Sequence, residues 1–335
     1  MQYSLTNTTT VTQEEGGKGA VGVSGAARIT SQPPPRSAGA PVDMNEYLPD
    51  TILEIVVTEQ HEVANLLGVC AGYEDGNWRF SQLSLDLIEW SLDWVLTPSE
   101  LEGFGASTAF SLISKTLSRI YKSNKYQKRG EVGELLLHII LRKFLQSQKV
   151  ISRIYFKDAP NDTVKGFDAV HLVDAEHEDF QLWLGESKFY TDSTSAVSAV
   201  LDELKLHLKT DYLRSEFAVI ADKIPAGWAH EEKIKSLLNR TNSLDQVFQR
   251  VVIPVFITFD SPTTIDYTES SDEYLEAIKN ELTEQWSSFR GKLDGITLPR
   301  TVRVHLILLP MATKKHLIDS FDERLKAWQV ATSSS

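Results

Sequence analysis

The sequence has one cysteine, Cys70, among its 335 residues. A single cysteine cannot form an internal disulfide, so the chain does not have the pattern of a disulfide-stabilised secreted domain, and a reducing compartment is indicated. A lone thiol of this kind is most often buried and inert. The N-terminus also lacks the apolar core of a signal peptide, and no run approaches the ~20 apolar residues of a membrane span. We therefore expect a cytoplasmic protein.

An excess of positive charge is missing as well. Lys and Arg number 34 against 46 Asp and Glu, which gives a formal charge of −12. Proteins that hold nucleic acid by general electrostatics need clustered Lys and Arg, so any DNA contact must be local or assisted by a partner. Acidity alone is also common among soluble proteins. The composition, 41% hydrophobic and 24% charged, suits one large or two modest globular domains.

Residues 1–41 offer little to bury. They are rich in Thr, Gly, Ser and Pro, which predicts a flexible tail. Gly17, Gly19 and Gly22 have the spacing of a dinucleotide-binding fingerprint, but no strand pattern precedes them and no helix pattern follows, so we reject that interpretation. The chain has no G-x-x-x-x-G-K-[ST] loop either, so ATP hydrolysis would belong to another protein.

The remaining sequence mixes helical and strand periods, which predicts an α/β fold. Residues 42–125 form a predicted N-terminal α/β portion, with a strand at 51–57 and helices at 83–96 and 106–122. Residues 126–335 begin with a helix that is apolar nearly all round, and then give a hairpin with strands at 166–173 and 180–190. Beyond the hairpin we expect a helix at 196–213, strands at 251–259 and 302–309, and helices at 272–290 and 314–329.

Two opposite charges, Glu186 and Lys188, interrupt the strand predicted at 180–190. Residues two apart on a strand point to the same face, so the two head groups should share one small volume. Other E-x-K triplets at 203–205 and 231–233 lie in helical segments, where residues two apart do not face each other. Only the strand copy is expected to converge.

The predicted hairpin brings Asp168 opposite Glu186 or within one residue of it. Two carboxylates that converge repel each other, and their burial requires a cation between them. Lys188 could be that cation. So could a divalent metal such as Mg²⁺, which binds a few carboxylates together with water and substrate phosphate. The alternative, a salt-bridged strand end without chemistry, stays open on this pattern alone.

The helix that begins at Gly130 places two acids, Glu131 and Glu134, in its first turn. Glu134 leads into the apolar face that should pack on the hairpin, although the helix dipole alone also favours acids there. His138 lies one turn further along and is more typical of a hydrogen-bonded core histidine than of a ligand.

The charged residues on the helix and the hairpin resemble the motif of a known nuclease superfamily. Glu134 on a helix, Asp168 opening a hairpin and Glu186-x-Lys188 in its second strand resemble the PD-(D/E)xK nuclease superfamily, although Phe167 stands where many members have proline. The resemblance implies a restriction-endonuclease-like core over 126–335, a mixed sheet flanked by helices. More narrowly, "RGEVGELLLHIILRKF", "GFDAVHLV", "LWLGESKFY" and "LDELKLHL" resemble the HamA nuclease subunits of Hachiman anti-phage defence systems, over roughly residues 50–320.

The resemblance implies a metal-dependent DNA nuclease that works with a helicase partner, HamB. Glu134, Asp168 and Glu186 would then bind Mg²⁺ or Mn²⁺, with Lys188 as the catalytic lysine and Glu131 as a weaker candidate. Two alternatives remain: a catalytically silent interaction or sensor subunit of the same kind of complex, and a stand-alone restriction-type endonuclease, which would need an electropositive groove.

Two further patterns are weaker. Lys205 and Lys209 are four apart and would share a face of the predicted helix at 196–213, where they could contact phosphate or form a solvated surface. Arg303 and His305 alternate with apolar residues, as in a half-exposed strand, and are assigned structure only.

Overall fold

A computed structural model of the chain describes residues 48–62, 64–101, 104–105, 107–120, 130–152, 166–175, 179–224, 227–299 and 301–332. All of them belong to one compact unit that spans 43–335. The predicted tail over 1–41, its three glycines and the predicted boundary near residue 125 lie outside the described residues.

A mixed seven-stranded sheet forms the centre of this unit, in the order β1-β2-β9-β8-β7-β6-β5. The inner strands β2, β9, β8 and β7 run parallel, whereas β1, β6 and β5 pair antiparallel with their neighbours. The strands are β1 Glu54–Glu59, β2 Ala64–Cys70, β5 Gln148–Ser152, β6 Ala169–Asp174, β7 Phe180–Phe189, β8 Val251–Asp260 and β9 Arg303–Met311. A separate short hairpin joins β3 Tyr73–Glu74 to β4 Asn77–Trp78.

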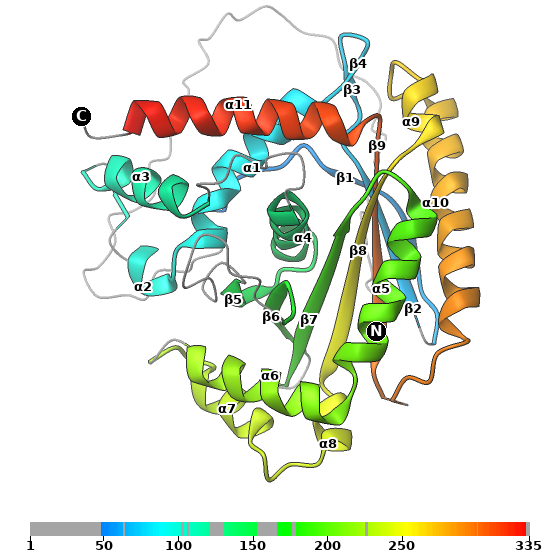
Figure 1. Ribbon diagram of the computed structural model, residues 1–335. Coiled ribbons are helices and arrows are strands. Elements are labelled where there is room, and N and C mark those ends of the chain that lie inside the picture. Colours follow the sequence, from blue (N-terminus) through cyan, green and yellow to red (C-terminus); the bar gives the residue numbers. More distant parts are fainter. Residues whose placement is uncertain are drawn as a thin grey trace, which may run out of the picture. The chain divides into compact units, whose positions relative to one another are not determined.

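Helices cover both faces of the sheet (Figure 1). One face carries α1 Phe80–Val95, α3 Ala109–Ile120, α4 Gly130–Phe144 and α11 Lys314–Thr332, and the other carries α5 Ser193–His207 and α10 Asp272–Leu293. Shorter or peripheral helices are α2 Pro98–Leu101, α6 Thr210–Lys223, α7 Glu231–Leu238, α8 Leu244–Phe248 and α9 Pro262–Asp266. The predicted α/β architecture, a mixed sheet flanked by helices, is confirmed.

Helix α4 is the most deeply buried helix near the predicted hairpin. All residues from Val132 to Arg142 are buried, as the apolar pattern predicted. The helix packs against β6, β7 and β8. It joins the same hydrophobic cluster as Ala169, Trp183 and Phe189, which point to one face of the hairpin. Helix α5 packs against the opposite face of the hairpin.

The helix predicted over 196–213 is wrong in its length. α5 ends at His207, and Lys209 has extended backbone angles (φ −69°, ψ 136°) before α6 begins. This turn lets the new helix place Leu213 and Phe217 in the core, where each is 1% exposed. Lys209 therefore does not share a helix face with Lys205.

The single cysteine and the apolar character of the helices bear on two expectations from composition. Cys70 is free and buried, and burial raises the pKa of its thiol to about 11, so the expected inert cysteine is confirmed. Among the helices in the described ranges, none has both the length and the apolar character needed to cross a membrane.

Candidate functional site

The β6–β7 hairpin has the predicted register. Ala169 pairs with Gly185, and the backbone N–H of Asp168 donates to the carbonyl of Gly185 over 2.9 Å. Continuing this antiparallel register by one residue places Asp168 opposite Glu186. The turn is local and the strands alternate cleanly, so the sequence was sufficient to fix this pairing.

Side-chain alternation puts the charged residues on the α5 face of the hairpin. Leu182 and Leu184 belong to the hydrophobic cluster that includes α5, and Glu186 and Lys188 continue the same alternation. Glu186 is 2% exposed and Asp168 is 3% exposed, whereas Lys188 is partly buried. The strand thus ends in a buried acid followed by a lysine nearer the solvent.

Helix α5 supplies two partners that the sequence patterns did not reveal. The ammonium of Lys188 forms an ion pair with the carboxylate of Glu203. One turn later, Nδ1 of His207 lies 2.6 Å from Oε1 of Glu186. Residues four apart share one face of a helix, so both partners reach the strand together. Their spacing, on a helix that follows the E-x-K strand, is the signal that could have identified them.

The environment of Glu186 disfavours its charge. Burial raises the pKa of this carboxyl well above its ordinary value, and the negative charges of Asp168 and Glu203 raise it further, against the opposing effect of Lys188. Burial also opposes the charge of Lys188. The hydrogen bond and charge of Glu203, with smaller contributions from Glu186 and Asp168, nevertheless raise the pKa of Lys188 overall. The group therefore combines a protonated lysine with a carboxyl that needs a nearby cation.

Asp168 is held by the strand opposite it. Its Oδ2 accepts hydrogen bonds from the backbone N–H and from the hydroxyl of Ser187, both over 2.8 Å. Ser187 in turn lies against the first turn of α4, where a Cβ added at Gly133 would be 3.4 Å from its Oγ and 3.0 Å from the Cβ of Phe189. Glycine at this position permits the close approach of α4 to the hairpin.

Glu134 stands next to Gly133 in this turn and is buried, at 5% exposure. It lies in the α4 layer, close to Ser187, which binds the carboxylate of Asp168, whereas the side chain of Glu186 contacts α5. Glu131, one turn earlier, is only partly buried. The structure therefore brings Asp168, Glu186 and Lys188 together, and places Glu134 on the neighbouring layer at the same end of the hairpin.

The donor groups are compatible with a small divalent cation. In the ranges that the structure describes, no three or more His, Cys, Asp or Glu side chains are arranged as a ready metal-binding cluster. Mg²⁺, however, commonly uses one or two protein carboxylates and completes its shell with water and substrate phosphate. Oε1 of Glu186 is buried and lies 2.6 Å from Nδ1 of His207. A cation beside Asp168 and Glu186 would relieve their repulsion.

The comparisons with known proteins agree on one family. The HamA family model matches residues 46–325. The chain belongs to the HamA family. It is also similar to Anti-bacteriophage protein A of Escherichia coli (strain K12), with 20% identity over 256 residues, which cover 76% of this chain and 46% of that protein. The HamA chain thus spans about half the length of the curated relative that it matches.

His138 of this HamA chain is a core residue. It is fully buried, with Nε2 2.8 Å from Oδ2 of Asp93 and Nδ1 3.3 Å from Nε2 of His171. Arg142 donates from Nε to the same carboxylate oxygen over 2.9 Å. Burial lowers the pKa of His138 to about 4, although Asp93 opposes the shift. The prediction of a hydrogen-bonded core histidine is confirmed.

The other E-x-K triplets of the HamA chain do not form internal pairs. Lys205 pairs with Asp202 at 3.1 Å on the exposed side of α5, and Glu231 pairs with Lys235 at 2.6 Å along α7. Glu203 faces the strand instead. The expectation that only the strand copy converges is confirmed, and one residue of a helical copy is its partner.

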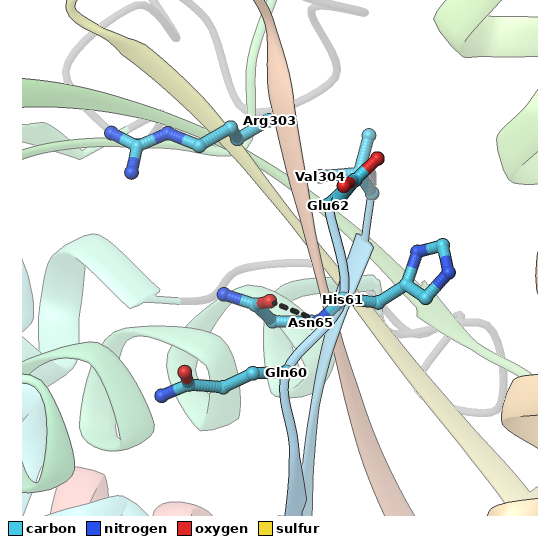
Figure 2. A pocket seen from close by; sticks show the side chains of 6 residues that line it. All are labelled: Gln60, His61, Glu62, Asn65, Arg303 and Val304. Carbon is cyan, nitrogen blue, oxygen red and sulfur yellow. Dashed lines mark hydrogen bonds between the residues drawn. The ribbon is translucent and has the colours of Figure 1, made fainter. Parts of the chain in front are cut away.

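A pocket lies at the other end of the parallel strands (Figure 2). Gln60, Asn65 and Arg303 extend to one side of the strands and His61 to the other, and the His61 N–H donates to Oδ1 of Asn65 over 3.1 Å (Figure 2). Ala64 pairs with Val304 here, at the amino ends of β2 and β9. Ligands of open α/β sheets bind outside the carboxyl ends of the strands, so the hairpin site is the stronger candidate.

Proposed function

We propose that this HamA chain is a metal-dependent DNA nuclease that acts as the effector subunit of an anti-phage defence complex with a helicase. The observation that supports this most is the convergence of Asp168, Glu186 and Lys188 at one end of a buried hairpin. A buried carboxyl with a strongly raised pKa beside a second acid is costly for the fold, and such groups concentrate at functional sites.

Each residue has a role in phosphodiester hydrolysis. Asp168 and Glu186 would hold Mg²⁺ or Mn²⁺, which, when bound, polarises a phosphate oxygen and lowers the pKa of water. Lys188, held protonated by its surroundings, would stabilise the negative charge that builds on the phosphate as water attacks phosphorus. The P–O bond to the leaving sugar oxygen then breaks, and that oxygen takes up a proton. Glu134 would contribute from the first turn of α4.

The partner and the biological role rest on the family and on charge. A net charge of −12 disfavours autonomous DNA capture, and the sequence has no phosphate loop for ATP. A helicase that delivers DNA would supply both functions. The similar protein of Escherichia coli carries the description "Anti-bacteriophage protein A", which supports a role in defence.

One observation favours the second candidate, a catalytically silent interaction subunit. Lys188 already has an ion-pair partner on α5, and Glu186 already has a polar contact with His207 there. A structural ion-pair cluster would have the same contacts, so cleavage itself must decide between the two functions.

The deciding experiment is cleavage of plasmid and linear DNA with Mg²⁺ or Mn²⁺, with and without the helicase. Lys188→Ala and Glu186→Ala should each abolish cleavage while the circular dichroism spectrum stays native. Lys205→Ala and Lys233→Ala are matched controls and should cleave like the wild type, because neither lysine lies on the strand. Equal losses in all four variants, or no cleavage by the wild type under any condition, would reject the proposed nuclease.

Metal binding gives a test that needs no DNA. Mg²⁺ or Mn²⁺ at millimolar concentration should raise the melting temperature of the wild type, because a ligand that binds only the folded state stabilises it. Asp168→Asn should show little of this rise. An identical response in both proteins would favour the ion-pair interpretation.

A further inference from the structure

We propose that α5 contributes two positioning residues to the site, Glu203 for Lys188 and His207 for Glu186. This inference rests on the proposed nuclease function and extends it to residues outside the D…E-x-K pattern. Glu203 would fix where the lysine ammonium meets the phosphate, and His207 would fix the carboxylate that faces the cation.

The Glu203–Lys188 pair is built to orient a flexible side chain. A lysine side chain loses rotamer entropy when it is fixed, so a catalytic lysine needs a partner that orders it before substrate arrives. The side chain of Lys188 is 12% exposed, whereas that of Glu203 is 40% exposed and lies nearer the solvent. The pair therefore holds the ammonium in place near the solvent, from which DNA would approach.

The His207–Glu186 contact is held by an aromatic support. The His207 ring stacks on Tyr212, with centroids 4.6 Å apart and planes 12° apart, and meets Phe167 edge-on at 5.1 Å. These neighbours come from α6 and from the residue just before Asp168. They leave the imidazole little freedom to turn, so its 2.6 Å contact with Glu186 is held from two sides. Partners of ligand residues that are fixed in this way commonly set ligand orientation.

Packing alone does not require these two polar residues. The face of α5 toward the sheet is already filled by Ala196, Val197, Val200, Leu201 and Leu204, all buried. The neighbouring acid Asp202 points to solvent, where its side chain is 76% exposed and pairs with Lys205. Asp202 therefore provides a matched control, because it lies beside Glu203 on the same helix and carries the same charge.

The test measures DNA cleavage by the full chain, with its helicase if the wild type requires it, as a function of Mn²⁺ concentration. Glu203→Gln should lower the maximal rate by about 10- to 100-fold and leave the half-saturating Mn²⁺ concentration unchanged. His207→Phe, which keeps the aromatic stack, should raise the half-saturating Mn²⁺ concentration several-fold. Asp202→Asn should change neither quantity. Mn²⁺ binding without DNA, followed by electron paramagnetic resonance, should weaken only in His207→Phe.

Several results would overturn the inference. The inference fails if the α5 variants behave like Asp202→Asn or cleave faster than the wild type. It also fails if the maximal rate and the half-saturating Mn²⁺ concentration both change in proportion to the melting temperature. If the wild type cleaves DNA and the α5 variants are indistinguishable from it, only this inference fails. If the wild type never cleaves, the proposed nuclease fails and this inference fails with it.

Discussion

The surroundings of Glu186 lower the free energy of unfolding at neutral pH. Its pKa in the folded state lies above the value in the unfolded chain, because of burial and because of Asp168 and Glu203. Below the unfolded pKa, both states are protonated and the residue has no effect on stability. As pH rises above that value, the unfolded chain releases the proton first, so the free energy of unfolding falls.

We therefore expect Glu186→Gln, which removes the charge and keeps the shape, to stabilise the fold at pH 8. The melting temperature should rise by a few degrees at most, since about 1 kcal/mol corresponds to roughly 2–4 °C in domains of about 150–250 residues and to less in a larger one. The gain should disappear near pH 4, where the wild-type acid is also neutral. A lower melting temperature at pH 8 would mean that the contact with His207 outweighs the burial cost.

The buried histidine His138 gives an independent pH dependence. Its pKa is lowered to about 4 in the fold, below the value near 6.5 of the unfolded chain. Between these values the unfolded chain binds more protons, so stability decreases as pH falls from 6.5 to 4. The loss attributable to this residue should be on the order of 3 kcal/mol.

Urea denaturation at pH 7 and pH 4.5 measures this loss. His138→Gln retains a donor for Asp93 and cannot be protonated, so its stability should change less between the two pH values than that of the wild type. An equal change in the two proteins would show that other groups cause the acid sensitivity.

At the scale of single residues, the sequence predicted the site only in part. Asp168, Glu186 and Lys188 were predictable because a strand period and a local hairpin register determine which side chains meet. Glu203 and His207 were not, because their role depends on how α5 docks on the sheet, which is a tertiary contact. Local periodicity cannot indicate such a partner.

Among the elements, β2 and α10 meet at a glycine. A Cβ at Gly68 would lie 2.6 Å from Cγ1 of Val57 and 2.7 Å from Cδ1 of Leu282. Gly68→Ala should therefore destabilise the fold by about 1–3 kcal/mol through overpacking. Gly291, in the last turn of α10, has nothing within 4 Å of its added Cβ, so Gly291→Ala should stabilise by about 0.5–1 kcal/mol. Chemical denaturation of both variants tests the pair, and a neutral Gly68→Ala would contradict it.

Strand β2 was not predicted from the sequence. β2 has the sequence ANLLGVC and is buried on both faces, so it lacks the alternation by which half-buried strands are recognised. The break between α5 and α6 was also missed, because neither glycine nor proline marks it. The long amphipathic helices and the charged hairpin were predicted correctly because their period is visible within a single segment.

The whole molecule has a net charge of −12, which under the proposed function should limit its unaided binding to DNA. At 150 mM salt, the purified chain should bind duplex DNA with a Kd weaker than about 1 µM, the range of non-specific binding. Fluorescence anisotropy with and without the helicase measures this affinity, and the helicase should tighten it. Tight binding by the chain alone, with cleavage at defined sequences, would favour a stand-alone restriction-type endonuclease.

The N-terminal tail predicted over 1–41 should be dispensable. Its sequence has few apolar residues with which to dock, so its deletion should leave the melting temperature and the cleavage rate close to those of the full chain. A complete loss of cleavage in the deletion variant would assign the tail a functional role.

The pairing of β2 with β9 also determines when the protein can mature on the ribosome. Ala64 pairs with Val304, so β2 cannot pair with β9 until β9 is synthesised near the end of translation. At about 5–20 residues per second, the delay is roughly 10–50 s. Until β9 is made, β2 lacks this neighbour, and so does β8 once it has been synthesised. A nascent chain halted between Asp260 and Arg303 would therefore expose two apolar strand edges. We therefore expect premature termination to yield an unfolded chain that chaperones bind and proteases degrade, and not a folded, shortened protein.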